Sequence, residues 1–170
     1  MNYFAYGSNM SLARLRERAP SARRIATFAL AGHALRFHKA GRDGSGKCDA
    51  YATGDPGDLL LGALFDICAS HKPALDAAEG LGAGYEEKVV VLEGAGGGRV
   101  EAVTYYATAI DASLRPYCWY RNHVLVGARE SLLPAAYIAR IERVDTWRDP
   151  DPLREARQLA IHGQPGPSPA

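Results

Sequence analysis

Two short segments carry residue types that could bind an anion and move a proton. The first, Tyr6-Gly7-Ser8-Asn9, follows a short aromatic segment and precedes a helical one. A loop in that position can direct successive backbone N–H groups at one point, and the side chains of Ser8 and Asn9 add further donors. On spacing alone, an anion-binding loop and a plain strand–helix connection are equally open interpretations.

The second segment ends at Glu79, which closes the apolar helical stretch 74–78 and precedes a glycine. Most such carboxylates are exposed residues at helix ends. A glutamate that points into an aromatic pocket instead could act as a general acid and base. Tyrosines near enough to line such a pocket are Tyr85, Tyr105, Tyr106 and Tyr120. A tyrosine-rich core is the simpler explanation of the nine tyrosines.

A third segment nearly matches a phosphate-binding loop. Residues 41–48 follow the pattern G-x-x-x-x-G-K-[ST] except at the last position, where Cys48 lacks the hydroxyl that holds magnesium. The pattern also needs a helix after it, and residues 49–53 are typical of a strand. We therefore interpret residues 40–47 as a flexible surface loop.

The remaining reactive side chains form no recognisable catalytic pattern. The three cysteines, Cys48, Cys68 and Cys118, are far apart and make no zinc spacing, as expected for reduced thiols in the cytosol. Cys118 and His123 are five residues apart, which is a poor helical offset for a nucleophile and its base. For the arginine cluster over residues 14–24, we favour a solvated helix face over attraction of an acidic substrate.

Hydrophobic patterning and turn residues predict the elements that must position these side chains. Gly32 divides residues 25–37 into a bent strand or two strands, and the glycine-rich segment 93–98 predicts a hairpin. Strands are expected at 2–6, 50–53, 60–67, 85–92 and 99–107, and helices at 12–18, 72–79, 119–130, 134–144 and 153–161. This order favours an α+β fold with a mostly antiparallel sheet that could close on itself.

Length and charge limit the class of protein. The chain has 170 residues, which suits one domain over residues 1–162 followed by a disordered tail at 163–170. A net charge of +1 provides no basic surface for nucleic acid. The sequence shows neither a membrane-spanning apolar run nor a signal peptide, so we expect a cytoplasmic protein.

Three motifs in the same order resemble the γ-glutamylcyclotransferase family. They are the N-terminal signature over residues 3–10, the segment 75–80 with Tyr85 five residues beyond it, and Tyr120 with the segment 127–134. The resemblance extends over roughly residues 2–143. It implies a small, largely closed β-barrel flanked by helices, without a cofactor or a metal. It also implies that Glu79 is the catalytic acid and base.

The same resemblance implies a pocket and a reaction. The residues Tyr6, Gly7, Ser8 and Asn9 match the loop that holds the glutamyl group, and Tyr85, Tyr105 and Tyr120 match pocket tyrosines, with Tyr106 competing for the place of Tyr105. The expected reaction releases 5-oxoproline and a free amine from a γ-glutamyl amino acid or amine, by attack of the substrate's own α-amine. The alternative is a non-catalytic binding or regulatory protein that uses the same cavity. The leaving amine, and the choice between a monomer and a homodimer, stay open.

Overall fold

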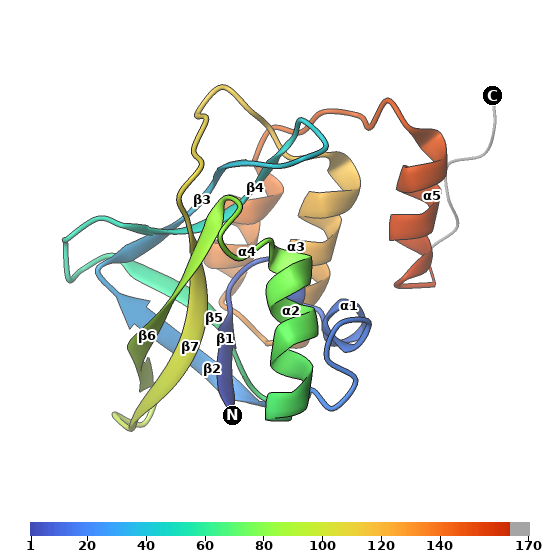
Figure 1. The fold of residues 1–170 in the computed structure, drawn as a ribbon. Helices are drawn as coiled ribbons and strands as arrows, with labels where there is room; N and C mark the ends of the chain where they lie inside the picture. Colours follow the sequence, from blue (N-terminus) through green and yellow to red (C-terminus); the bar gives the residue numbers. More distant parts are fainter. Residues whose placement is uncertain (164–170) are drawn as a thin grey trace.

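The computed structural model describes residues 1–163, which fold into strands and helices in the order that Figure 1 shows. The strands are β1 (Asn2–Ala5), β2 (Arg23–Ala31), β3 (His33–Ala40), β4 (Gly46–Ala52), β5 (Leu59–Asp66), β6 (Tyr85–Gly94) and β7 (Arg99–Ala107). The α-helices are α1 (Leu12–Arg16), α2 (Lys72–Glu79), α3 (Cys118–Glu130), α4 (Ala135–Glu142) and α5 (Pro152–Ala160). Two short 3₁₀ helices, Ser8–Met10 and Ala69–His71, precede α1 and α2.

Five strands close into a barrel in the order β1-β5-β2-β6-β7. All neighbours are antiparallel except β1 and β7, which run parallel and meet at Tyr3 and Val103. Strand β1 carries three consecutive buried residues, Tyr3, Phe4 and Ala5, because both of its faces are covered. The predicted α+β fold with a largely closed, mostly antiparallel barrel is confirmed.

Strands β3 and β4 form a separate two-stranded sheet. Of the two interpretations of residues 25–37, a bent strand or two strands, the structure has two strands. Gly32 adopts a φ of 72° between the end of β2 and the start of β3. Strand β4 starts earlier than expected, at Gly46, and β3 extends to Ala40. The connection between them is therefore only residues 41–45.

The predicted hairpin is formed by β6 and β7. Its register pairs Tyr85 with Ala107 at the open end and Glu93 with Arg99 beside the turn. Gly97 adopts a φ of 77° in that turn, a conformation that glycine enters at little cost.

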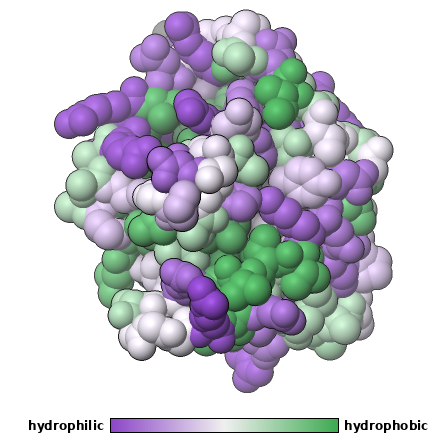
Figure 2. All heavy atoms as spheres, turned by 90° about the vertical axis from the view of Figure 1, so that its left-hand side faces the viewer, coloured by the Kyte–Doolittle hydropathy of each residue, from purple (hydrophilic) through white to green (hydrophobic). Residues whose placement is uncertain are grey.

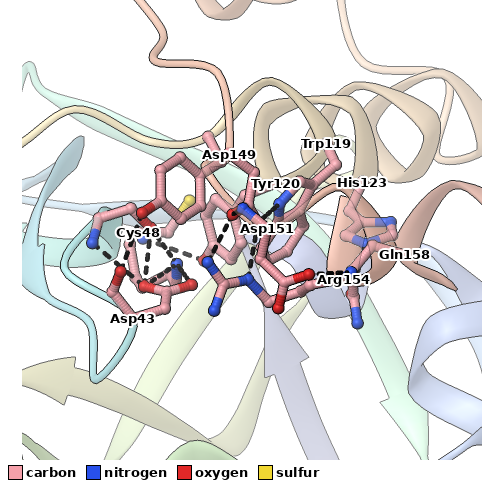
Figure 3. Close-up of polar contacts among 12 residues, drawn as sticks. Asp43, Cys48, Trp119, Tyr120, His123, Asp149, Asp151, Arg154 and Gln158 are labelled. Atoms are coloured by element: carbon pink, nitrogen blue, oxygen red, sulfur yellow. Dashed lines mark hydrogen bonds and ion pairs between the residues drawn. The ribbon is translucent and has the colours of Figure 1, made fainter. Parts of the chain in front are cut away.

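Helices α1, α2 and α3 lie together on one side of the barrel, with α5 farther out beside them (Figure 1). Helix α3 is the most buried helix, and it approaches the N-terminal segment so closely that a Cβ at Gly127 would lie 2.4 Å from the Cβ of Met10. Asp151 caps the start of α5. Asp149, just before it, accepts hydrogen bonds from Trp119 of α3 and from Arg154 of α5, as Figure 3 shows. These contacts dock the C-terminal helix onto α3.

Hydrophobic side chains gather on the face of the molecule that Figure 2 shows, surrounded by polar ones. Large apolar side chains that remain exposed on the barrel strands include Ile25, Leu59, Val89 and Val91. The homodimer stays a prediction. Among residues 1–163, the helices are too short or too polar to cross a bilayer. The single domain over 1–162 also stays a prediction, and the predicted disordered tail lies outside the described residues except for Gly163.

Candidate active site

The end of helix α2 presents Glu79 to the N-terminal loop. Gly80 adopts a left-handed conformation, with a φ of 75°, and its N–H donates to the carbonyl of Asp76 at 2.9 Å. This is a common helix ending that glycine favours. Glu79 is half-buried, and its Oε1 accepts a hydrogen bond from Asn9 Nδ2 at 2.7 Å. Two segments seventy residues apart thus meet at one carboxylate.

Both the nitrogen and the oxygen of the Asn9 side-chain amide make hydrogen bonds. Its Nδ2 also donates to the hydroxyl of Tyr3 at 3.1 Å, and its Oδ1 accepts from Arg18 Nη1 at 3.0 Å. Because the oxygen faces a guanidinium, the NH₂ group must face Glu79 and Tyr3. The orientation of Asn9, and through it that of the Glu79 carboxylate, is therefore determined by β1, α2 and the turn after α1.

The loop before Asn9 brings backbone donors to the same place. Met10 N–H donates to the Gly7 carbonyl, which closes the 3₁₀ turn. Within residues 1–163, the backbone N–H groups of Gly7, Ser8 and Asn9 meet no protein acceptor. Gly7 packs so tightly that a Cβ there would lie 2.8 Å from the Cβ of Cys48. The loop can therefore offer adjacent donors to an anion.

Tyrosine rings form the walls around this loop. Tyr6 donates from its hydroxyl to the carbonyl of Tyr105 at 2.7 Å. Tyr85 donates to the carbonyl of Cys48, and the Tyr120 hydroxyl accepts from the N–H of Cys48 at 3.1 Å. Figure 3 shows Tyr120 beside Cys48. Burial raises the pKa of the Tyr6, Tyr85 and Tyr120 hydroxyls well above the ordinary value, so these walls are uncharged.

Tyr105 and Tyr106 have different surroundings. Tyr105 is buried, and its hydroxyl donates to Asp76 Oδ1 of α2 at 2.5 Å. Tyr106 points to the other side of β7, where Lys88 Nζ lies 5.2 Å from its ring centroid. Of the two candidates, the structure brings Tyr105 to the loop and to Glu79. Its bond to Asp76, three residues before Glu79, also anchors α2.

Glu79 lines two neighbouring spaces. The inner recess has a volume of about 20 Å³, enough for little more than one water-sized group, and the outer cavity has a volume of about 220 Å³. Both are lined by Ser8, Glu79, Tyr85 and Tyr120. The inner recess adds Tyr3, Tyr6, Gly7, Asn9, Cys48 and Tyr105. The structure therefore gathers around these spaces the residues that the sequence singled out for the site, except Tyr106.

The segment between β3 and β4 lines the outer cavity, and the interpretation of residues 40–47 as a flexible surface loop is wrong in part. Arg42 and Gly44 are exposed, but the ends of the range belong to β3 and β4. Ser45 is fully buried, and Asp43 accepts hydrogen bonds from the backbone and hydroxyl of Ser45. Lys47 Nζ binds Asp43 Oδ2 at 2.8 Å and lies about 5 Å from the ring centroids of Trp119 and Tyr120. Lys47 of β4 lies against rings of α3, which is distant in sequence, and its ion pair with Asp43 holds this segment at the cavity.

The interpretation of the arginine cluster is wrong for three of its members, one of which is Arg24, half-buried and paired with Glu130. Arg16 and Arg23 are exposed, as expected. Arg14 is buried and Arg18 is half-buried, and both line the outer cavity. The physical reason is that α5 covers α1 from outside, where Gln158 accepts from Arg14 Nη1 at 2.6 Å. A helix face that looks solvated in the sequence is covered in the fold.

Sequence reasoning also missed supporting residues. Tyr3 was part of a motif but had no role, and Asp76 and Lys39 carried no signal. Spacing offered one clue, since Asp76 precedes Glu79 by three residues and so lies on the same face of α2. Lys39 is buried at the end of β3 with its Nζ 4.7 Å from the ring centroid of Tyr85. Nothing in the local sequence marks it as a cavity residue.

Comparisons with known proteins show what the chain resembles in sequence and fold. Residues 60–141 match the AIG2-like family. Human γ-glutamylcyclotransferase is 29% identical over 150 residues, which cover 84% of this chain and 78% of that protein. A solved γ-glutamyl cyclotransferase shares the fold with a TM-score of 0.84 and 23% identity, covering 96% of this chain and 99% of the other. The human uncharacterized protein loc79017 has a TM-score of 0.77 and 25% identity, covering 86% of this chain and 88% of the other.

Proposed function

The chain is a relative of the γ-glutamylcyclotransferases, and we propose that it is an enzyme of this type that converts a γ-glutamyl amide into 5-oxoproline and a free amine. The observation that carries the proposal is the hydrogen bond between Glu79 and Asn9, which joins the helix-end carboxylate to the anion-binding loop. In this reaction the substrate's α-amine nitrogen bonds to its own γ-carbonyl carbon, and the amide C–N bond breaks.

The first requirement of the reaction is a folded substrate. Holding the amine against the carbonyl in the right geometry can supply roughly 7–11 kcal/mol of the barrier. The tyrosine walls suit this task because Tyr85 and Tyr120 are themselves fixed by the backbone of Cys48. The glutamyl half would lie against Gly7, Ser8 and Asn9, and the amine half would extend into the outer cavity.

The second requirement is a proton carrier. An α-amine is mostly protonated at neutral pH, so a base must remove a proton before the nitrogen attacks. Glu79 would take that proton and return it to the leaving nitrogen, whose expulsion as an anion is otherwise difficult. Its Oε1 is occupied by Asn9, whereas Oε2 has no hydrogen-bond partner among residues 1–163. We assign the proton transfer to Oε2.

The third requirement is stabilisation of charge on the substrate. The free N–H groups of Gly7, Ser8 and Asn9 would bind either the α-carboxylate or the oxyanion that develops on the γ-carbonyl. Their rigid turn supports both assignments, since the donors are in place before the substrate arrives.

The test is release of 5-oxoproline, followed by mass spectrometry, from γ-glutamyl amino acids and γ-glutamyl amines. We expect product from the wild-type protein and a loss of roughly 10²–10⁴-fold in kcat for Glu79→Gln. Glu86→Gln is the matched control, because Glu86 is exposed on β6 and lines neither space.

Circular dichroism would establish that both variants are folded. Full turnover by Glu79→Gln would exclude the proton-carrier role. Binding of γ-glutamyl compounds without any turnover by the wild-type protein would favour the binding-protein alternative.

A further inference from the structure

The outer cavity contains more cationic side chains than its own carboxylates can pair. Its two carboxylates are Asp43 and Glu79. Its five cations are Arg14, Arg18, Lys39, Arg42 and Lys47. Lys47 is paired with Asp43. The other four cations make no ion pair within residues 1–163, and Glu79 is the only carboxylate of the cavity that remains to face them.

Arg14 is the clearest example of a cavity cation without a carboxylate partner. Its exposed fraction is 7%, and its polar partners are the neutral Gln158 and, 3.1 Å away, His123 Nε2. Figure 3 shows His123 and Gln158 side by side, from α3 and α5. Burial, and secondly the charge of Arg14, lower the pKa of His123 to about 2, so His123 adds no charge. Arg14 Nε has no hydrogen-bond partner in the described part of the chain.

The excess of positive charge continues toward the opening of the cavity, at Lys39 and Arg42. Lys39 is 6% exposed, and burial lowers its pKa below the ordinary value while Glu79 opposes the shift. Arg42 is exposed, beside the end of α2, and no hydrogen bond holds its guanidinium within residues 1–163. A buried cation without a carboxylate is unfavourable, so a cavity that keeps Arg14 and Lys39 unpaired suits an anionic occupant.

We propose that the outer cavity is an anion subsite for the amine half of the substrate, and that it selects a leaving amino acid with an acidic side chain. This inference rests on the proposed function. The amine half of a γ-glutamyl amino acid with a neutral side chain brings one carboxylate into the outer cavity, because the glutamyl half lies against the Gly7–Asn9 loop. With Glu79, that makes two negative groups against four unpaired cations. An acidic side chain on the amine half adds a third negative group and reduces the excess of positive charge.

The deciding experiment compares two dipeptides of nearly the same shape, γ-glutamyl-glutamate and γ-glutamyl-glutamine. We expect kcat/KM for 5-oxoproline release to be at least about tenfold higher for the acidic peptide, a difference of about 1.4 kcal/mol. Arg42→Gln should bring this ratio toward one, and Lys39→Gln should do the same. Arg143→Gln should preserve the ratio, because Arg143 is exposed and lies outside both spaces. Arg42 is exposed, so its variant should fold normally.

A binding measurement separates this proposal from the proposed function. Calorimetry with Glu79→Gln reports the affinity for each dipeptide without turnover. Tighter binding of the acidic peptide, with no turnover by the wild-type protein, would support the anion subsite and overturn the cyclotransferase reaction. Turnover of both peptides with equal kcat/KM would support the reaction and overturn the subsite. Equal affinities, or no binding, together with no turnover would overturn both.

Discussion

The inner recess and the outer cavity share Glu79 but differ in chemistry. The inner recess is lined by neutral tyrosines, an amide and backbone N–H groups, and most of its hydroxyls are already hydrogen-bonded to protein atoms. The outer cavity is lined by charged side chains, several of which have no partner of opposite charge. A preorganised, neutral environment suits bond making and proton transfer, because it does not have to rearrange during the reaction. An excess of one charge suits the choice of a ligand.

This contrast separates two kinds of variant. Changes in the inner recess should lower kcat to the same extent for every substrate. Changes in the outer cavity should alter KM in a way that depends on the charge of the amine half.

After the loss of Glu79 itself, the largest effect is expected from Asn9→Ala. Removing a hydrogen bond to a charged group costs about 1.5–3 kcal/mol, which corresponds to a fall in kcat of roughly 10- to 100-fold. Steady-state kinetics on acidic and neutral substrates should show the same factor for both. Asn2→Ala is the control, because Asn2 donates to the carbonyl of Glu101 on the barrel edge. A factor that depends on substrate charge would contradict the separation of the two spaces.

The next largest effect is on stability, from Gly7→Ala. The new Cβ would lie 2.8 Å from the Cβ of Cys48, so the loop or β4 must move. Overpacking of this kind costs about 1–3 kcal/mol in the free energy of unfolding, which urea denaturation would measure. Gly96→Ala is a matched control, since a Cβ there meets nothing within 4 Å. Equal stability of the two variants would show that the close contact at Gly7 is unimportant.

A smaller effect is expected on the pH dependence of stability, through His123, which contacts Arg14. Burial, together with Arg14, holds the pKa of His123 at about 2 in the folded protein, against 6.5 for an ordinary histidine. Between these values the unfolded chain binds a proton that the folded protein does not. The free energy of unfolding should therefore fall as the pH drops below about 6.5.

His123→Gln tests this pH dependence. The variant should lose part of the decrease in melting temperature between pH 7 and pH 5. His71→Gln, which removes a contact with Ser21 elsewhere in the fold, should keep the full decrease. An unchanged pH dependence in His123→Gln would show that His123 does not resist protonation.

The smallest effect is expected from Tyr105→Phe. The variant removes the hydrogen bond to Asp76, while Lys72 still binds that carboxylate and holds it in place. A single hydrogen bond contributes about 0.5–1.5 kcal/mol, so kcat should fall by roughly 2- to 10-fold as α2 loosens. Tyr106→Phe is the natural control on the neighbouring residue. A larger effect from Tyr106 than from Tyr105 would reverse their assignment.

Local patterns in the sequence were sufficient for most of the fold. The glycine-rich hairpin and the helix end at Gly80 depend on a few neighbouring residues, and both were predicted; at Gly32 the sequence left open a bent strand or two strands. The alternation of side chains along a strand did not show which of Tyr105 and Tyr106 lines the pocket. Thr104 and Tyr105 are both buried, because one face of β7 lies inside the barrel while α2 covers the other.

By itself, the sequence determined the order of the elements and the two segments that meet at the site, Gly7–Asn9 and Glu79. Only the tertiary structure decided which cations surround them. Arg14 is hydrogen-bonded to Gln158, which is 144 positions away, and Asp43 of segment 41–45 is held by Lys47, which lies against aromatic rings of α3. Backbone preferences and turn residues act over a few residues and are visible in the sequence. The burial of a charge depends on what packs against it from distant parts of the chain, and that is established only when the chain has folded.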